Sequence, residues 1–132
     1  MNNLDFLYEE NILEHYRNPK NKVERDFEVC ETCGIGENVD CGDRAEIFLD
    51  IDNGKIKNVT WTGTGCAISQ AAMSMMTEKI KNDRIGLQDL KLWSPSVIYE
   101  LLGVKISPSR VNCALLSYKC LENALKNIDN KN

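Results

Sequence analysis

The chain has 132 residues, 42% hydrophobic and 27% charged, as in a soluble globular protein rather than a disordered one. Its 16 lysine and arginine residues against 20 aspartate and glutamate residues give a formal charge of −4, which argues against an electrostatic nucleic-acid binder. No apolar run approaches the roughly 20 residues that span a bilayer, and the acidic N-terminus does not resemble a secretory signal. We therefore expect one cytoplasmic domain over residues 1–132, without membrane or nucleic-acid partners.

The N-terminal third is predicted to form a helix and a long loop. Apolar residues recur at every fourth position over residues 4–17. Asn18-Pro19 ends this helix, because proline disfavours the α conformation in the residue before it. Residues 18–43 are polar and irregular, and a loop of that length is usually functional or disordered.

A β-hairpin is predicted next. Residues 44–51 alternate with period two and have one mostly apolar face, as expected for a strand. Asn53-Gly54 favours a tight hairpin turn, and the return strand covers about 56–62, with Val59 and Trp61 on one face. Gly63-Thr64-Gly65 ends this strand.

The rest of the chain is predicted to be helical. An apolar stripe of period 3.6 over 67–80 predicts one helix. Ser94-Pro95 and Ser107-Pro108 each read as an N-cap followed by proline at the first helical position, and Gly103 closes the shorter of these two helices. A long helix with one apolar face then runs through Ile128, so the expected class is α+β, a small antiparallel sheet packed with helices.

Cysteine is the residue type most informative about chemistry. In a reducing cytosol we expect thiols rather than disulfides, and a cysteine-rich chain there more often binds metal or carries out sulfur chemistry. Three of the six cysteines stand at predicted element boundaries, where distant segments can direct side chains to one point. These three are Cys41, Cys66 and Cys113.

Convergence of these cysteines with Asp43 would create a metal site with four ligands. Thiolates are the soft ligands that hold zinc or iron–sulfur clusters. The Asp43 carboxylate is a hard oxygen ligand, so its bond is expected to exchange more easily than a thiolate bond. Such a ligand set suits a cluster that must leave the protein.

Several segments together resemble the iron–sulfur cluster assembly scaffolds, a family that includes IscU, the N-terminal domain of NifU, and SufU. The resemblance runs in order from about residue 5 to 128. Its most specific parts are residues 7–21, Cys41-Gly42-Asp43, the G-x-G-C-A-x-S segment at 63–69, and residues 108–114.

The resemblance implies a compact α+β fold with a three-stranded antiparallel sheet, whose third strand would come from residues 30–42. It implies a scaffold, not itself an enzyme, that accepts sulfur from a cysteine desulfurase. The scaffold assembles a transient [2Fe–2S] cluster and passes it to apo iron–sulfur acceptor proteins. The family's ligands match Cys41, Asp43, Cys66 and Cys113, and zinc often occupies the same site.

The subfamily stays open at this point. Asn112 stands where IscU-type members have a histidine, and the insertion of SufU-type members is absent between Cys66 and Cys113, although residues 65–69 look more like SufU. A SufU-type protein would be a zinc-dependent sulfurtransferase, whereas a third alternative is a zinc-stabilised interaction domain. The chaperone-recognition segment of IscU matches residues 106–110 poorly, so a chaperone partner has no support in the sequence.

The first sulfur acceptor also has two alternatives. IscU-like chemistry would use Cys113, and SufU-like chemistry would use Cys41. We favour Cys41 because a glycine-containing loop moves more easily than a helix.

Three further residue groups are interpreted without reference to the family. Cys30-Glu31-Thr32-Cys33 is either a redox or metal-binding pair or two incidental loop thiols. Cys120 is expected to pack in the core, and His15, the single histidine, is expected to be structural.

Overall fold

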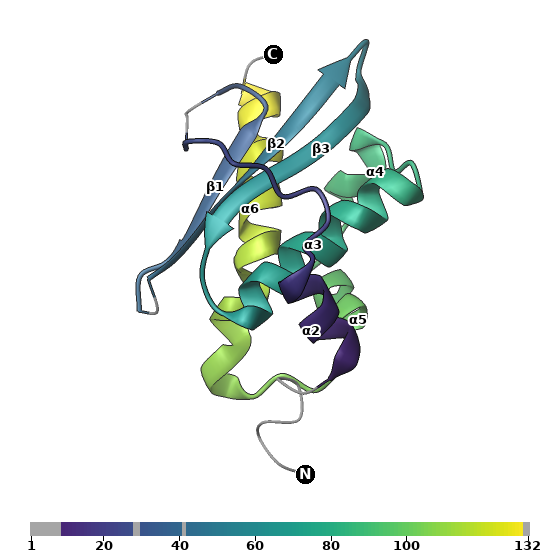
Figure 1. The fold of residues 1–132 in the computed structure, drawn as a ribbon. Coiled ribbons are helices and arrows are strands. Elements are labelled where there is room, and N and C mark those ends of the chain that lie inside the picture. Colours follow the sequence, from purple (N-terminus) through teal and green to yellow (C-terminus); the bar gives the residue numbers. More distant parts are fainter. Residues whose placement is uncertain (1–8, 28–29, 41, 131–132) are drawn as a thin grey trace.

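The computed structural model describes residues 9–27, 30–40 and 42–130, and the elements below belong to these ranges (Figure 1). The strands are β1 (Cys33–Asn38), β2 (Asp43–Asp52) and β3 (Lys55–Thr64). The helices are α2 (Glu10–Arg17), α3 (Ala67–Asn82), α4 (Leu87–Lys91), α5 (Ser96–Leu102), the 3-10 turn η1 (Pro108–Arg110) and α6 (Val111–Asn130).

The strands form one antiparallel sheet in the order β1-β2-β3. The β2–β3 hairpin turns at Asn53 and Gly54, whose φ angles of 55° and 75° are those of the tight turn that this dipeptide favours. Strand β1 lies within residues 30–42, where the resemblance placed a third strand, and pairs Cys33 with Phe48 and Asn38 with Asp43. The α+β prediction is therefore confirmed.

The helices pack on one face of the sheet. Helix α6 lies along β1 and β2, α3 packs against β3, and α2 packs on α3 (Figure 1). The contact between α6 and β1 is close, because a Cβ atom on Gly34 would run into the backbone of Cys120 and Ala124. Glycine at this strand position is therefore required by the nearby helix.

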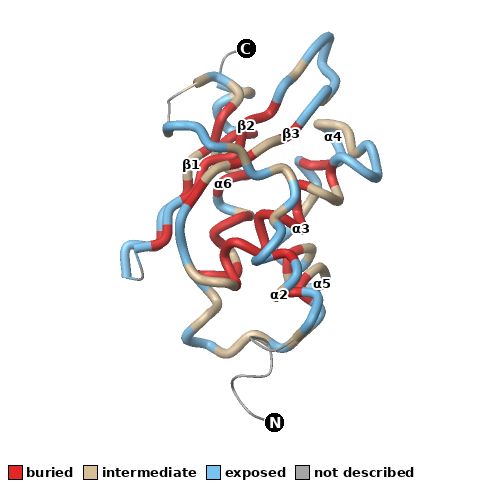
Figure 2. The backbone as a smooth tube through the Cα atoms, in the orientation of Figure 1, coloured by how far each residue is buried: buried red, intermediate tan, exposed pale blue. Residues whose placement is uncertain are grey.

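The core lies between the sheet and the helices (Figure 2). Ala45, Ile47 and Leu49 are buried on the predicted apolar face of β2. On the opposite face of β2, Glu46 and Phe48 are also buried and only 0% and 5% exposed. The reason is tertiary, because the segment before β1 crosses this face and stacks the Arg25 guanidinium 3.9 Å from the Phe48 ring centre.

Several predicted boundaries need correction. Within the described residues, the helix predicted over 4–17 begins at Glu10. Its N-cap is Glu9, whose side chain accepts a 2.9 Å hydrogen bond from the Ile12 amide. Residues 4–8 lie outside the described residues. Pro95 is the N-cap of α5 rather than its first helical residue. Helix α4 was not predicted, whereas Gly103 closes α5 with a φ of 70°, as expected.

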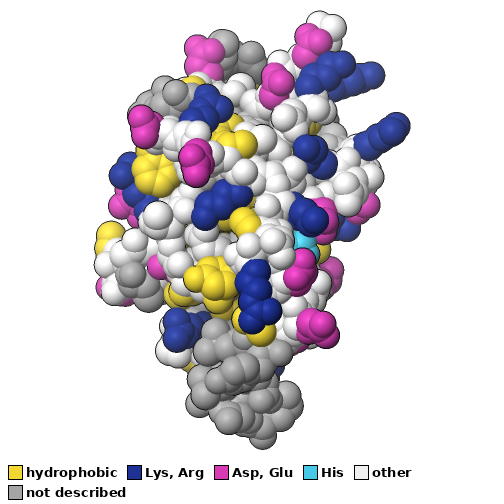
Figure 3. All heavy atoms as spheres, viewed as in Figure 1, with side chains coloured by type: hydrophobic (Ala, Val, Ile, Leu, Met, Phe, Trp, Pro, Cys, Tyr) yellow, Lys and Arg dark blue, Asp and Glu magenta, His cyan; other side chains and the backbone are white. Residues whose placement is uncertain are grey.

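The surface is mixed in charge. On the face shown in Figure 3, lysine and arginine side chains lie among aspartate and glutamate side chains. None of the helices within 9–27, 30–40 and 42–130 combines the length and hydropathy needed to cross a membrane.

Candidate metal centre

Three of the predicted ligands converge at one end of the sheet. Asp43 is the first residue of β2, Cys66 is the N-cap of α3, and Cys113 lies in the first turn of α6. One ligand atom from each residue lies within 4.8 Å of the other two. Three segments that are distant in sequence therefore direct a carboxylate and two sulfur atoms at one point.

The backbone beside these residues is shaped by glycine. Gly42, just before Asp43, has a φ of 74°, a backbone conformation that residues with a side chain rarely adopt. Gly65 lies against Asp43, and a Cβ atom built on Gly65 would be 2.8 Å from the Asp43 Cγ and 2.5 Å from the Ser69 Oγ. Only a residue without a side chain lets β2 and the start of α3 approach this closely.

Burial distinguishes these ligands from surface groups. Asp43 is 4% exposed and Cys113 is 0% exposed, while Cys66 is half-buried. The Asp43 Oδ2 atom is buried without a hydrogen-bond partner, an arrangement that costs free energy unless a cation satisfies it. A set of two thiolates and one carboxylate therefore fits zinc or an iron–sulfur cluster.

Asn38 is a neighbour of the centre that the sequence did not indicate. Its amide Nδ2 donates to the Cys113 Sγ at 3.7 Å, and this donor supports negative charge on the sulfur. Asn38 belongs to no motif, and its position becomes visible only once β1 is paired with β2 so that Asn38 faces Asp43.

The fourth predicted ligand, Cys41, lies outside the described residues. It stands two positions before Asp43 in the sequence. A site with four ligands therefore stays a prediction, built on the three residues that the structure brings together.

His15 and Cys120 occupy the positions expected of structural residues. The His15 Nδ1 lies 2.6 Å from the Ser74 Oγ and joins α2 to α3, and His15 is not part of the metal-ligand group. Cys120 is 0% exposed and donates from its Sγ to the Ala45 carbonyl oxygen at 3.4 Å. Burial raises the pKa of the Cys120 thiol to about 12, so this thiol stays protonated near neutral pH.

The expectation that every cysteine stays a thiol is wrong for one pair, because Cys30 and Cys33 form a disulfide. A turn at residues 31–32 brings their Cα atoms to 5.2 Å, within the range of about 4.4–6.8 Å that a disulfide spans. The pair lies at the start of β1, the end of that strand that is farther from Asp43.

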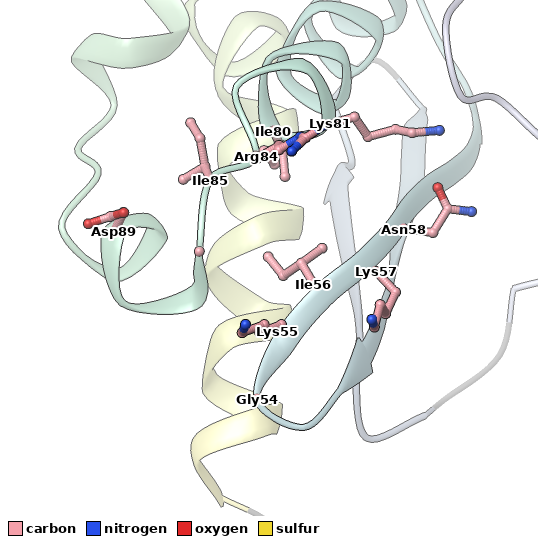
Figure 4. A pocket seen from close by; sticks show the side chains of 11 residues that line it. Gly54, Lys55, Ile56, Lys57, Asn58, Ile80, Lys81, Arg84, Ile85 and Asp89 are labelled. Carbon is pink, nitrogen blue, oxygen red and sulfur yellow. The ribbon is translucent and has the colours of Figure 1, made fainter.

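A hollow lies away from the metal centre, between β3 and the segment after α3 (Figure 4). It has a volume of about 840 Å³, an apolar floor that includes Ile56, Ile80 and Ile85, and lysine side chains at its rim. Among the described residues no cysteine or histidine lines it, so these residues do not give it the soft ligands of the centre described above.

Comparison with known proteins gives concordant matches. A family model described as NifU-like N terminal domain matches residues 7–132. The zinc-dependent sulfurtransferase SufU of Bacillus subtilis is 37% identical over 136 aligned positions, covering 91% of this chain and 90% of that protein. The iron–sulfur cluster assembly scaffold protein IscU of Thermotoga maritima is 30% identical and covers 92% of this chain and 94% of its own. The crystal structure of a putative iron–sulfur cluster assembly scaffold protein for the SUF system from Fervidobacterium islandicum superposes with a TM-score of 0.62, at 30% identity, over 90% of this chain and 96% of its own.

Proposed function

Because the chain belongs to the family of NifU-like N-terminal domains, we propose that it is a scaffold for iron–sulfur cluster assembly. It accepts sulfur from a cysteine desulfurase, assembles a transient [2Fe–2S] cluster and passes that cluster to apo iron–sulfur acceptor proteins. The observation that carries this proposal is the convergence of Asp43, Cys66 and Cys113, with a buried carboxylate oxygen that lacks a partner.

The chemistry of this ligand set supports a cargo site rather than a permanent one. Thiolates bind iron tightly, while a carboxylate oxygen is a harder and more exchangeable ligand. Asp43 thus provides the point at which an acceptor's thiolate can displace a ligand. Cys66 is half-buried and gives the centre a side open to solvent, whereas Cys113 lies beneath the surface. We take residues 1–132 as one domain with these ligands and Cys41 as the fourth.

A second function is favoured by a specific observation, the 37% identity to a protein named zinc-dependent sulfurtransferase. Zinc held by the same residues would keep the thiolates deprotonated, which is the state that accepts and relays sulfur. Under this alternative the protein is a sulfurtransferase and the cluster is built elsewhere. A cytoplasmic location stays a prediction under both functions.

Anaerobic reconstitution with iron and sulfide separates the two functions. A scaffold should develop the visible absorbance of a [2Fe–2S] cluster and transfer it to an apo ferredoxin, whereas a relay should stay colourless, retain zinc and stimulate the desulfurase. Cys66→Ser should abolish cluster formation, because it replaces a sulfur ligand by a weaker oxygen ligand. Cys120→Ala is the matched control, since its thiol is buried outside the metal-ligand group. A cluster that forms equally well on Cys66→Ser would contradict the site.

We infer the first sulfur acceptor from the burial of Cys113. Cys113 is 0% exposed and contacts Asn38, so a desulfurase reaches it only after the surrounding chain moves. We therefore propose Cys41 as the acceptor. Mass spectrometry after treatment with desulfurase and cysteine should show persulfide on Cys113→Ser and none on Cys41→Ser. The opposite pattern would assign the role to Cys113.

A further inference from the structure

The Cys30–Cys33 pair has no part in the function proposed above, and its surroundings differ for its two sulfur atoms. Cys33 is 3% exposed and is the first residue of β1, whereas Cys30 is half-buried and precedes the strand. A reagent in solution therefore meets the Cys30 sulfur before the Cys33 sulfur. From this asymmetry we propose that Cys30–Cys33 is a dithiol–disulfide exchange site that reacts with an external dithiol.

The surface beside the disulfide gives a partner room to approach. Cys30 and Cys33 together border two hollows of about 310 and 350 Å³. One hollow includes Arg25 and Asp50 among its lining residues, and the other includes Glu46 and Lys126. Each hollow thus has one basic and one acidic side chain among its lining residues, and these two charges offset each other.

The exchange is a two-electron reaction with a defined direction of attack. A thiolate of the external dithiol attacks the Cys30 Sγ, the Cys30–Cys33 bond breaks, and the Cys33 sulfur leaves and takes up a proton. The second thiol of the partner then attacks the mixed disulfide and releases the Cys30 thiol. The partner becomes a disulfide and loses two electrons and two protons, which the Cys30–Cys33 pair gains.

The fold does not need the disulfide to hold this segment. The Thr32 carbonyl accepts a 3.0 Å hydrogen bond from the Leu49 amide, and the Cys33 carbonyl accepts a 2.7 Å hydrogen bond from the Asn127 Nδ2. A ring closed over two intervening residues also removes little entropy from the unfolded chain. Reduction should therefore leave the fold intact, so that the pair can cycle.

The site is separate from the metal centre and would stand if the proposed function failed. Cys33 pairs with Phe48, while Asp43 begins β2 five positions earlier, which places the two sites about 17 Å apart along the strand. The pair therefore exchanges with a partner in solution rather than with Cys66 or Cys113 of the same chain.

The test equilibrates the full-length native protein in buffers of reduced and oxidised glutathione, followed by acid quench and alkylation. Fragment-ion mass spectrometry then distinguishes Cys30, Cys33 and Cys41. We expect a single two-electron transition of the Cys30–Cys33 pair, an unchanged circular dichroism spectrum across it, and no modification of the buried Cys120. Reduction that requires denaturant, or a pair that stays reduced in oxidised glutathione, would overturn the proposal.

The direction of attack is tested with matched variants. Cys33→Ser should accumulate a glutathione mixed disulfide on Cys30 about tenfold faster than Cys30→Ser accumulates one on Cys33, because Cys30 is more accessible than Cys33. The same ordering should appear in the reduced parent protein as faster alkylation of Cys30, a measurement that does not depend on the folding of a variant. Equal rates at the two positions in both experiments would refute an exchange site entered through Cys30.

Discussion

Replacing Gly65 by alanine tests whether the metal centre depends on the close approach of β2 and α3. The added Cβ atom would lie 2.8 Å from the Asp43 Cγ, 2.9 Å from its Oδ1 and 2.5 Å from the Ser69 Oγ. Ordinary contacts begin near 3.4 Å, so the Asp43 carboxylate has to move by about half an ångström or more. Metal–ligand distances tolerate only about 0.2 Å, so Asp43 would no longer hold its ligand position.

Two magnitudes follow from this displacement. Zinc affinity should fall by about 10–100-fold, the loss typical when a group that positions a ligand is disturbed. Overpacking should also lower the free energy of unfolding of the metal-free protein by about 1–3 kcal/mol. Competition with a chromophoric chelator measures the affinity, and urea unfolding measures the stability.

Gly86→Ala is the matched control for this substitution. A Cβ atom on Gly86 meets nothing within 4 Å, and this residue has an ordinary φ of −85°. Its zinc affinity and stability should stay close to those of the parent protein. If Gly65→Ala binds zinc as tightly as Gly86→Ala, the close approach at Gly65 does not position Asp43, and the reasoning above is wrong.

Three further outcomes are expected. Asp43→Ala should release a reconstituted cluster more slowly than the parent, because the exchangeable oxygen ligand is gone; faster decay of the visible absorbance would show that Asp43 does not confer lability. Chelation of the bound metal should lower the melting temperature, since the ligands join distant segments and metal binding adds to folding; an identical melting curve before and after complete metal removal would exclude a stabilising site. The third concerns Cys120, whose pKa burial raises from 9.0 to about 12, so that above pH 9 the unfolded state loses a proton that the native state keeps. The contribution of the Cys120 thiol to stability is complete below pH 9 and should decline toward pH 12 by up to about 1.4 kcal/mol per pH unit. The free energy of unfolding of Cys120→Ala in urea should lack this decline. Equal pH slopes for the two proteins would show that Cys120 does not have a raised pKa.

The parts of the fold that were predictable are those with strong local signals. Alternation and Asn53-Gly54 located the β2–β3 hairpin, and the period of 3.6 located α3. Strand β1 has the sequence CGIGEN, whose glycines disfavour a strand. It forms because β2 pairs with it and α6 packs closely over Gly34, and both contacts are tertiary. Helix α4 has five residues, too few for a periodic signal.

In the candidate site, too, the residues with a local sequence signal were predictable and those placed by tertiary contacts were not. Motifs identified Asp43, Cys66 and Cys113 because each stands beside glycine or at an element boundary, and the structure brings these three together. No local signal reveals Asn38, whose role depends on strand pairing. The C-x-x-C spacing allowed a redox pair at Cys30 and Cys33, but the expectation of free thiols, drawn from the redox state of the cell compartment, did not consider the turn that closes the disulfide.

Helix α6 has one more consequence for the sulfur chemistry of this chain. Cys113 lies near the start of α6, and the Asn127 Nδ2 near its end donates a hydrogen bond to the Cys33 carbonyl. At the rise of an α-helix, Cys113 and Asn127 are about 21 Å apart along the helix axis. Exchange between sulfur atoms requires direct contact, so a helix packed along β1 insulates the two sites from each other. A persulfide formed on Cys113 would therefore not exchange with the disulfide of the same molecule for as long as α6 stays packed along β1.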